Sequence, residues 1–133
     1  MTGRMIHLAI ELGIEKNVLF TGFLRGSDID RAFQSANLFV MPSVSEPFGI
    51  AALESIKNGT PVLISKQSGA VELIPNMLKA DFWDIDEIAN KILSALIYEP
   101  MSNDLKYLSK KDLDKISWEN QGKKIKDIYH EMT

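Results

Sequence analysis

Short, continuous apolar runs alternate along this chain with stretches in which apolar residues recur every three or four positions. The continuous runs are typical of buried β-strands, and the spaced patterns of amphipathic helices. Strands are therefore predicted over residues 18–21, 37–41, 61–65 and 78–81. The predicted helices cover residues 5–12, 27–36, 50–57, 70–74, 85–96, 102–115 and 118–132.

Residues that cap helices lie at several of the predicted boundaries. Ser27, Asp84 and Ser117 are expected N-caps, because their side-chain oxygens can accept a hydrogen bond from a free helical N–H. Gly13 is expected to end the first helix, since glycine readily adopts the left-handed conformation of a C-cap. The expected buried faces are formed by Ile29, Ala32, Phe33 and Ala36, by Ile85, Ile88, Ala89, Ile92 and Leu96, and by Trp118, Gly122, Ile125, Tyr129 and Met132.

The alternation of strands with helices predicts an α/β protein with one parallel, Rossmann-like sheet and flanking helices. The chain has 133 residues, of which 45% are hydrophobic, so we expect residues 1–133 to form one compact domain. A formal net charge of -3 argues against nucleic acid or an anionic membrane as a main partner. There is no cysteine, which excludes disulfides and thiolate metal sites and suits a cytoplasmic protein. No apolar run is long enough to span a membrane.

The stretch between the second predicted strand, 37–41, and the third predicted helix, 50–57, has the composition of a ligand-binding turn. A strand at 37–41 leads through a polar loop into a helix that carries apolar residues at helical spacing and stops at Asn58-Gly59. Pro47 suits the first helical turn, and Ser45 or Glu46 is the expected cap. The free N–H groups at this helix start would then form an anion site beyond the strand. Those amides belong to Phe48, Gly49 and Ile50.

The same stretch carries two acids eight positions apart, Glu46 and Glu54. Together with Pro42-Ser43 before them, Pro47-Phe-Gly49 between them and Gly59-Thr-Pro-Val62 after them, they resemble the donor-binding signature of retaining GT-B glycosyltransferases of the glycogen-synthase and sucrose-phosphate-synthase kind. The resemblance implies a hexosyltransferase that uses a nucleotide-diphosphate sugar, with no metal and no other cofactor. The chain would then be the later part of the GT-B C-terminal domain.

The resemblance also implies roles for single residues. Glu46, the candidate catalytic residue, would contact the donor hexose, and Glu54 the ribose hydroxyls. The loop after the first predicted strand would lie against the nucleobase, which makes Gly22 and Phe23 candidates for base contact. Gly69 would let the backbone approach the sugar, although structural packing explains that glycine equally well. The implied substrate-binding set is Gly22, Phe23, Glu46, Pro47, Phe48, Gly49, Ile50 and Glu54.

Two parts of such an enzyme have no counterpart in these residues: the acceptor domain, and the donor-domain segment that carries an Arg and a Lys on the diphosphate. We therefore expect the chain to transfer no sugar by itself. In a sheet ordered 3-2-1-4-5-6, the strands 37–41 and 61–65 would take positions four and five, and 18–21 position three. Because its neighbours would be missing, residues 18–21 should pair either with 37–41 or with a second copy of the chain.

Other interpretations of the motif remain open. Glu46 can be a helix cap and Glu54 a solvated helix residue, with no role in binding. The chain can be a non-catalytic α/β interaction or receiver-like module, although no strand end carries the acidic cluster and following lysine of a phosphoacceptor. It can be part of a sugar-nucleotide epimerase, although neither His7 nor His130 lies near the motif.

Overall fold

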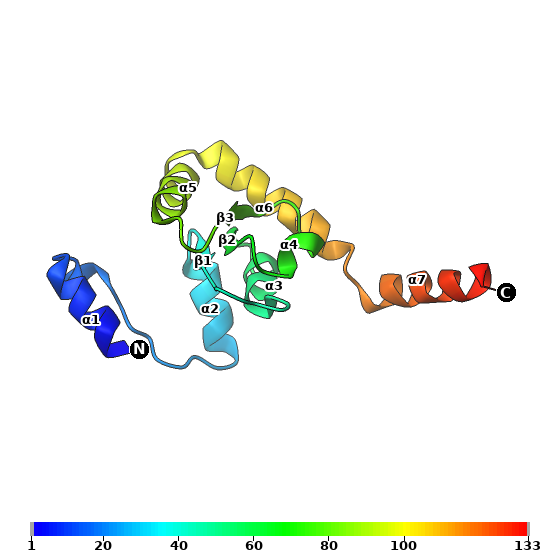
Figure 1. Cartoon of the computed structure of the whole chain (residues 1–133), viewed down its shortest axis with the longest axis horizontal. Helices are drawn as coiled ribbons and strands as arrows, with labels where there is room; N and C mark the ends of the chain where they lie inside the picture. Colours follow the sequence, from blue (N-terminus) through cyan, green and yellow to red (C-terminus); the bar gives the residue numbers. More distant parts are fainter. Residues whose placement is uncertain (1, 133) are drawn as a thin grey trace.

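The computed structural model describes residues 2–132, apart from the side chain of Trp118. Figure 1 shows a central α/β body with one helix projecting from it near each end of the chain. The helices are α1 (Thr2–Glu11), α2 (Ser27–Ser35), α3 (Ile50–Lys57), α4 (Ala70–Leu73), α5 (Ile85–Ile97), α6 (Glu99–Asp114) and α7 (Trp118–Glu131), with a short 3-10 helix, η1 (Glu15–Asn17). The strands are β1 (Phe39–Met41), β2 (Val62–Ser65) and β3 (Leu78–Ala80).

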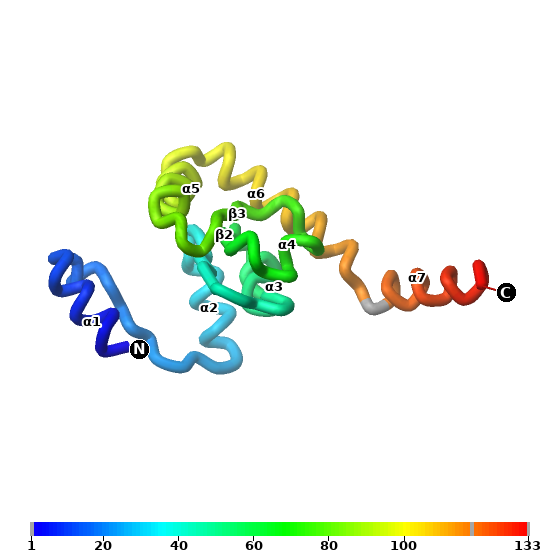
Figure 2. Tube along the Cα trace, in the orientation of Figure 1, coloured from blue at the N-terminus to red at the C-terminus, as the bar shows by residue number. Residues whose placement is uncertain are grey.

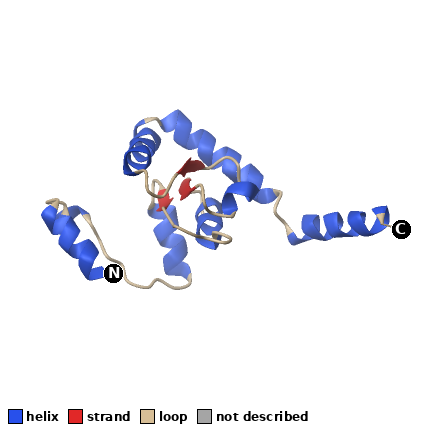
Figure 3. Cartoon of the chain, in the orientation of Figure 1, coloured by secondary structure: helices blue, strands red, loops and turns tan. Residues whose placement is uncertain are grey.

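The three strands form one parallel sheet in the order β1-β2-β3. Residues 62–65 are all buried, because β2 is the middle strand and helices cover both of its faces. Figure 3 shows the short red strands enclosed by blue helices. The predicted α/β class and the predicted strands at 37–41, 61–65 and 78–81 are therefore confirmed, each with slightly narrower bounds.

The two faces of β2 follow from the alternation of side chains along a strand. Val62 and Ile64 face a core that includes Ala52 and Ile56 of α3, all nearly inaccessible to solvent. Leu63 points the other way, toward Ile88 of α5. Helix α3 packs against β1 and β2, α5 against β2 and β3, and α6 contacts both helices. This arrangement places the carboxyl ends of the strands, and the loops that follow them, at one edge of the sheet.

The predicted strand at residues 18–21 is wrong. The chain runs from η1 to Gly26 without regular structure. In Figure 2 this segment connects α1 to α2 outside the central body. Leu19 is 85% exposed. An apolar run becomes a strand only where its backbone finds a partner, and β1 pairs with β2 alone in the described sheet. The direct pairing of 18–21 with 37–41 does not occur; pairing with a second copy stays a prediction.

Of the caps predicted at Gly13, Ser27, Asp84 and Ser117, three are confirmed, whereas the N-cap of α3 is Gly49 and not Ser45 or Glu46. Gly13 has φ 67°, and the N–H groups of Gly13 and Ile14 donate to carbonyls of the last turn of α1. The Asp84 carboxylate accepts from the N–H of Glu87 at 2.8 Å, and the Ser117 hydroxyl caps α7 in the same way. Ser27 is not a cap: it is the first residue of α2, and Gly26, with φ 53°, turns the chain one residue earlier.

The predicted buried faces are broader than the real ones. In α5 only Ala95 is buried, while Ile85 is 77% exposed, because the small sheet covers a narrow strip of the helix. In α2 only Phe33 is buried, and Ala32 is exposed. Helix α7 stands away from the body, so Gly122, Ile125, Tyr129 and Met132 are exposed, and the prediction for Trp118 lies outside the described side chains.

Helix α6 begins at Glu99, three residues before the predicted start, with Pro100 in its first turn. Proline is tolerated there because its missing N–H would have no helical partner. None of the helices described is long and apolar enough to cross a membrane.

Candidate functional site

The loop between β1 and α3 crosses the carboxyl edge of the sheet and ends at Gly49, the N-cap of α3. Gly49 has φ 75°, a left-handed conformation that favours glycine. It is also tightly enclosed, since a Cβ atom there would lie 2.9 Å from the Cβ of Ala70 and 3.2 Å from the Ser68 hydroxyl. Pro47 therefore lies in the loop rather than in the first helical turn, and that prediction is wrong because the helix begins three residues later, at Ile50.

The carboxylate of Glu46 folds back onto the start of α3. Its Oε1 atom accepts a hydrogen bond from the N–H of Gly49 at 3.0 Å and a longer one from the N–H of Phe48 at 3.4 Å. These are two of the three amides that the sequence predicts to bind an anion. In this structure the anion on them is the carboxylate of Glu46 itself, which compensates two free donors at the helix start.

A second loop, β2–α4 (residues 66–69), lies beside the first and fixes its backbone. The N–H of Gly69 donates to the carbonyl oxygen of Glu46 at 3.0 Å, and Glu46 and Ser68 form an isolated parallel bridge. The Ser65 hydroxyl donates to the carbonyl oxygen of Ser43 at 2.6 Å. The backbone of Glu46 is thus held by the neighbouring loop, independently of its side chain.

Only glycine fits at position 69, because the backbone of Pro47 lies directly against it. A Cβ atom added to it would lie 2.1 Å from the carbonyl oxygen of Pro47, far inside van der Waals contact. The sequence offered two interpretations for this glycine, close approach to a sugar or structural packing. The structure places the backbone of Pro47 against it, so packing accounts for the glycine.

The remaining predicted site residues are not all brought together. The side chain of Glu54 is exposed on α3, whereas Glu46 is half-buried. Gly22 and Phe23 lie in the irregular segment before α2, where Phe23 is 86% exposed and the Arg25 guanidinium lies 5.2 Å from its ring centroid. The structure does not place them among the loop contacts around Glu46.

Phe48 lines an apolar groove that the sequence did not reveal. The groove has a volume of about 470 Å³ and runs along α3, α4 and the junction of α6 with α7. The residues that line the groove come from distant parts of the chain, so no local sequence pattern predicts it. They are Phe48, Leu53, Leu73, Leu113, Ile116, Ser117 and Gln121.

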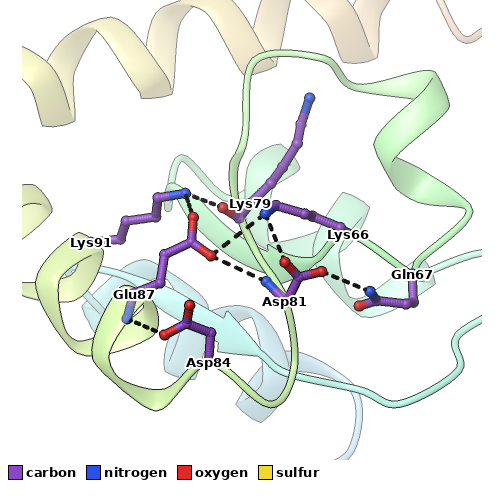
Figure 4. Close-up of polar contacts among 7 residues, drawn as sticks. All are labelled: Lys66, Gln67, Lys79, Asp81, Asp84, Glu87 and Lys91. Atoms are coloured by element: carbon purple, nitrogen blue, oxygen red, sulfur yellow. Dashed lines mark hydrogen bonds and ion pairs between the residues drawn. The ribbon is translucent and has the colours of Figure 1, made fainter.

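A polar network beyond the carboxyl ends of β2 and β3 was also missed (Figure 4). Asp81 accepts from the ammonium group of Lys66 at 2.9 Å and from the side-chain amide of Gln67 at 3.0 Å. The hydrogen bond from Lys66 holds the pKa of Asp81 below its usual value, and the same bond raises the pKa of Lys66. The only signal in the sequence is position, because Lys66 directly follows the predicted strand 61–65 and Asp81 is the last residue of the predicted strand 78–81.

Helix α5 extends this network. Glu87 accepts from the ammonium group of Lys91 at 2.6 Å, and its other oxygen lies 3.4 Å from the backbone nitrogen of Asp81. The hydrogen bond from Lys91 holds the pKa of Glu87 below its usual value. Within residues 2–132, no group of three or more His, Cys, Asp or Glu side chains is arranged to hold a metal ion.

Comparison with known proteins gives a consistent result. Residues 2–112 match the family model described as glycosyl transferases group 1. An uncharacterized glycosyltransferase of Methanocaldococcus jannaschii is 36% identical over 131 residues, covering 92% of this chain and 32% of the relative. The chain spans about a third or less of the length of the first curated relatives that it matches.

Two solved structures share the fold. Sucrose-phosphate synthase from Thermosynechococcus elongatus superposes with a TM-score of 0.81 at 25% identity, over 97% of this chain and 33% of the enzyme. The Anabaena protein HepE, solved in complex with UDP and glucose, gives a TM-score of 0.80 at 24% identity, over 86% of this chain and 32% of HepE. The α/β body described above is therefore that of a GT-B C-terminal domain.

Proposed function

The chain belongs to the group 1 glycosyl transferases, and from that membership we propose that it forms the donor-binding part of a retaining hexosyltransferase. The proposed donor is a nucleotide-diphosphate sugar. The observation that carries the proposal is the convergence of the Phe48 and Gly49 amides on one carboxylate oxygen. Two backbone donors at a helix start form an anion site, and a phosphate oxygen fits the same position.

The carboxylate of Glu46 then has two positions in the proposed cycle. Without donor it accepts from the Phe48 and Gly49 amides, as described above. When the donor binds, a phosphate oxygen takes over these amides, and the carboxylate turns to accept a hydrogen bond from a hydroxyl of the hexose. The exchange replaces one anion with another at the same donors, so no backbone N–H is left unpaired. The same amides stabilise the charge that develops on the leaving diphosphate.

Glu54 is the proposed ligand of the ribose hydroxyls, because its exposed carboxylate on α3 can accept two hydrogen bonds without first breaking a buried contact. The contact of Gly22 and Phe23 with the nucleobase stays a prediction. Their segment would have to approach the site edge, since Phe23 is exposed in the structure.

Transfer of the sugar to an acceptor requires more than the β1–α3 loop and helix α3. The chain corresponds to about a third of its relatives' length, so we propose that the acceptor site and the cations on the diphosphate are contributed by other parts of the full-length protein. The 133-residue chain alone should bind donor but transfer no sugar. The family match gives no support to the interaction-module and epimerase alternatives.

Saturation-transfer NMR on the 133-residue chain tests the proposal, with UDP-glucose, ADP-glucose and GDP-mannose as probes. HepE was solved with UDP and glucose, so UDP-glucose is the first probe. At least one of the three should receive saturation at its ribose and hexose protons. Glu54→Gln should weaken that binding by about 1–3 kcal/mol, the range of a charge-assisted hydrogen bond. The proposal is contradicted if none of the nucleotide sugars binds, or if Glu54→Gln binds as tightly as the wild type.

A further inference from the structure

We propose that Asp81 is a positioning residue for Glu46. It holds the first half of the β2–α4 loop, and that loop holds the backbone of Glu46. The role of Glu46 toward the donor rests on the proposed function. The chain of contacts from Asp81 to Glu46 does not, because it consists of hydrogen bonds at its two ends, joined by the backbone of residues 66–69.

The first step joins Asp81 to the start of the β2–α4 loop, and Figure 4 shows its two contacts side by side. One carboxylate oxygen, Oδ2, accepts from the ammonium group of Lys66, and the other, Oδ1, accepts from the side-chain amide of Gln67. Consecutive loop residues are thus tied to the same carboxylate. Both oxygens of Asp81 are needed to hold the pair.

The second step joins the loop to Glu46. Directly after Gln67, Ser68 turns back to donate its N–H to the carbonyl oxygen of Ser65, and Gly69 donates its N–H to the carbonyl oxygen of Glu46. The close approach of Gly69 to Pro47 leaves the two loops little room to slide. A displacement of Lys66 and Gln67 is therefore transmitted to the backbone that carries the Glu46 carboxylate.

Helix α5 keeps Asp81 in place from the opposite side. Glu87 approaches both the backbone nitrogen of Asp81 and, at 3.6 Å, the ammonium group of Lys66. Lys91 bonds in turn to Glu87 and to the carbonyl oxygen of Lys79, the residue two before Asp81. The lowered pKa of Asp81 agrees with a carboxylate that is held in its charged form.

Because the side chains of this network are partly exposed, we expect it to affect the β2–α4 loop more than the stability of the whole domain. The side chains of Lys66 and Asp81 are 45% and 27% exposed, so water and salt screen their attraction. Pairs of this kind contribute little to the stability of a whole domain. Within the loop, backbone hydrogen bonds hold Lys66 to Ala80 and Ser68 to Ser65, and the two contacts that Asp81 accepts fix the side chains of Lys66 and Gln67.

Amide hydrogen exchange in the 133-residue chain, followed by NMR, tests the inference without any ligand. Asp81→Asn should raise the exchange rates of the Gly69 and Gly49 amides by about tenfold, and those of β2 hardly at all. The matched control is Asp104→Asn, which removes an exposed acid of α6 outside the network and should change neither glycine. Unchanged glycine amides in Asp81→Asn, or an equal rise at every amide of the domain, would overturn the inference.

A double-mutant cycle with UDP-glucose connects the contacts to donor binding. Asp81→Asn should raise the dissociation constant severalfold in the wild-type background, and much less in the background of Glu46→Gln, because it acts through Glu46. Equal effects in the two backgrounds would overturn the inference. If the wild-type chain binds no UDP-glucose, the proposed function loses its support, and the exchange experiment alone decides the role of Asp81.

Discussion

Replacing Gly69 by alanine sets two opposing effects against each other at the centre of the site. Gly69 has φ -62° and ψ -24°, a conformation that alanine adopts without strain. In such a position Gly→Ala normally stabilises a protein by about 0.4–1 kcal/mol, because it reduces the freedom of the unfolded chain. Here the new Cβ atom would stand 2.1 Å from the carbonyl oxygen of Pro47.

The steric effect should win. Overpacking of a closely packed contact costs about 1–3 kcal/mol, and the atom that Cβ meets is backbone, which cannot rotate away. Separating the two loops also weakens the hydrogen bond from the Gly69 N–H to Glu46, worth about 0.5–1.5 kcal/mol. The sum predicts a net destabilisation of about 2 kcal/mol.

Urea denaturation followed by circular dichroism measures this difference. The matched control is Gly122→Ala in α7, where an added Cβ would meet nothing within 4 Å. That variant should keep or raise the midpoint and increase helix content, because alanine is the better helix former. A Gly69→Ala chain as stable as the wild type, or more stable, would refute the packing of Gly69 against Pro47.

Three further changes have defined outcomes. Ile64→Ala should lower the free energy of unfolding by about 2–5 kcal/mol in the same urea experiment, because Ile64 is only 1% exposed and its removal leaves a cavity. Burial raises the pKa of Asp112, but the hydrogen bonds from Asn76 and the hydrogen bond and charge of Lys115 together lower it more, to a net value below the usual 3.8. Its contribution is therefore complete above about pH 4 and lost as the pH falls through the lowered pKa, so Asp112→Asn should lose less stability between pH 6 and 3 than the wild type. In a full-length parent, Glu46→Ala should reduce turnover more than donor affinity, since a contact near the reacting carbon counts most in the transition state; unchanged turnover would make Glu46 only a structural residue.

Local sequence patterns were sufficient to predict much of the secondary structure of the central α/β body. The run at 61–65 is apolar and β-branched, a pattern that favours a buried strand, and β2 is found there. The caps at Gly13 and Asp84 are formed by hydrogen bonds between residues at most five positions apart, which a sequence pattern can encode. The motif around Glu46 was likewise found from residues close together in sequence.

What the sequence could not reveal depends on distant partners. Residues 18–21 have the composition of a strand, but the backbone of a strand needs a neighbour, and composition does not specify one. The Lys66–Asp81 pair joins loops that only the sheet order brings together. The position of the Glu46 carboxylate on the Phe48 and Gly49 amides is a choice of side-chain rotamer, for which the sequence carries no pattern.

In the proposed function, the Phe48 and Gly49 amides bind the donor phosphate in place of the Glu46 carboxylate. An NMR titration of the ¹⁵N-labelled chain with UDP-glucose tests it most directly. These two amide signals should shift and saturate with the same dissociation constant, UDP alone should also move them, and glucose alone should not. Saturable binding of UDP-glucose that moves other amides and leaves Phe48 and Gly49 unchanged would contradict it.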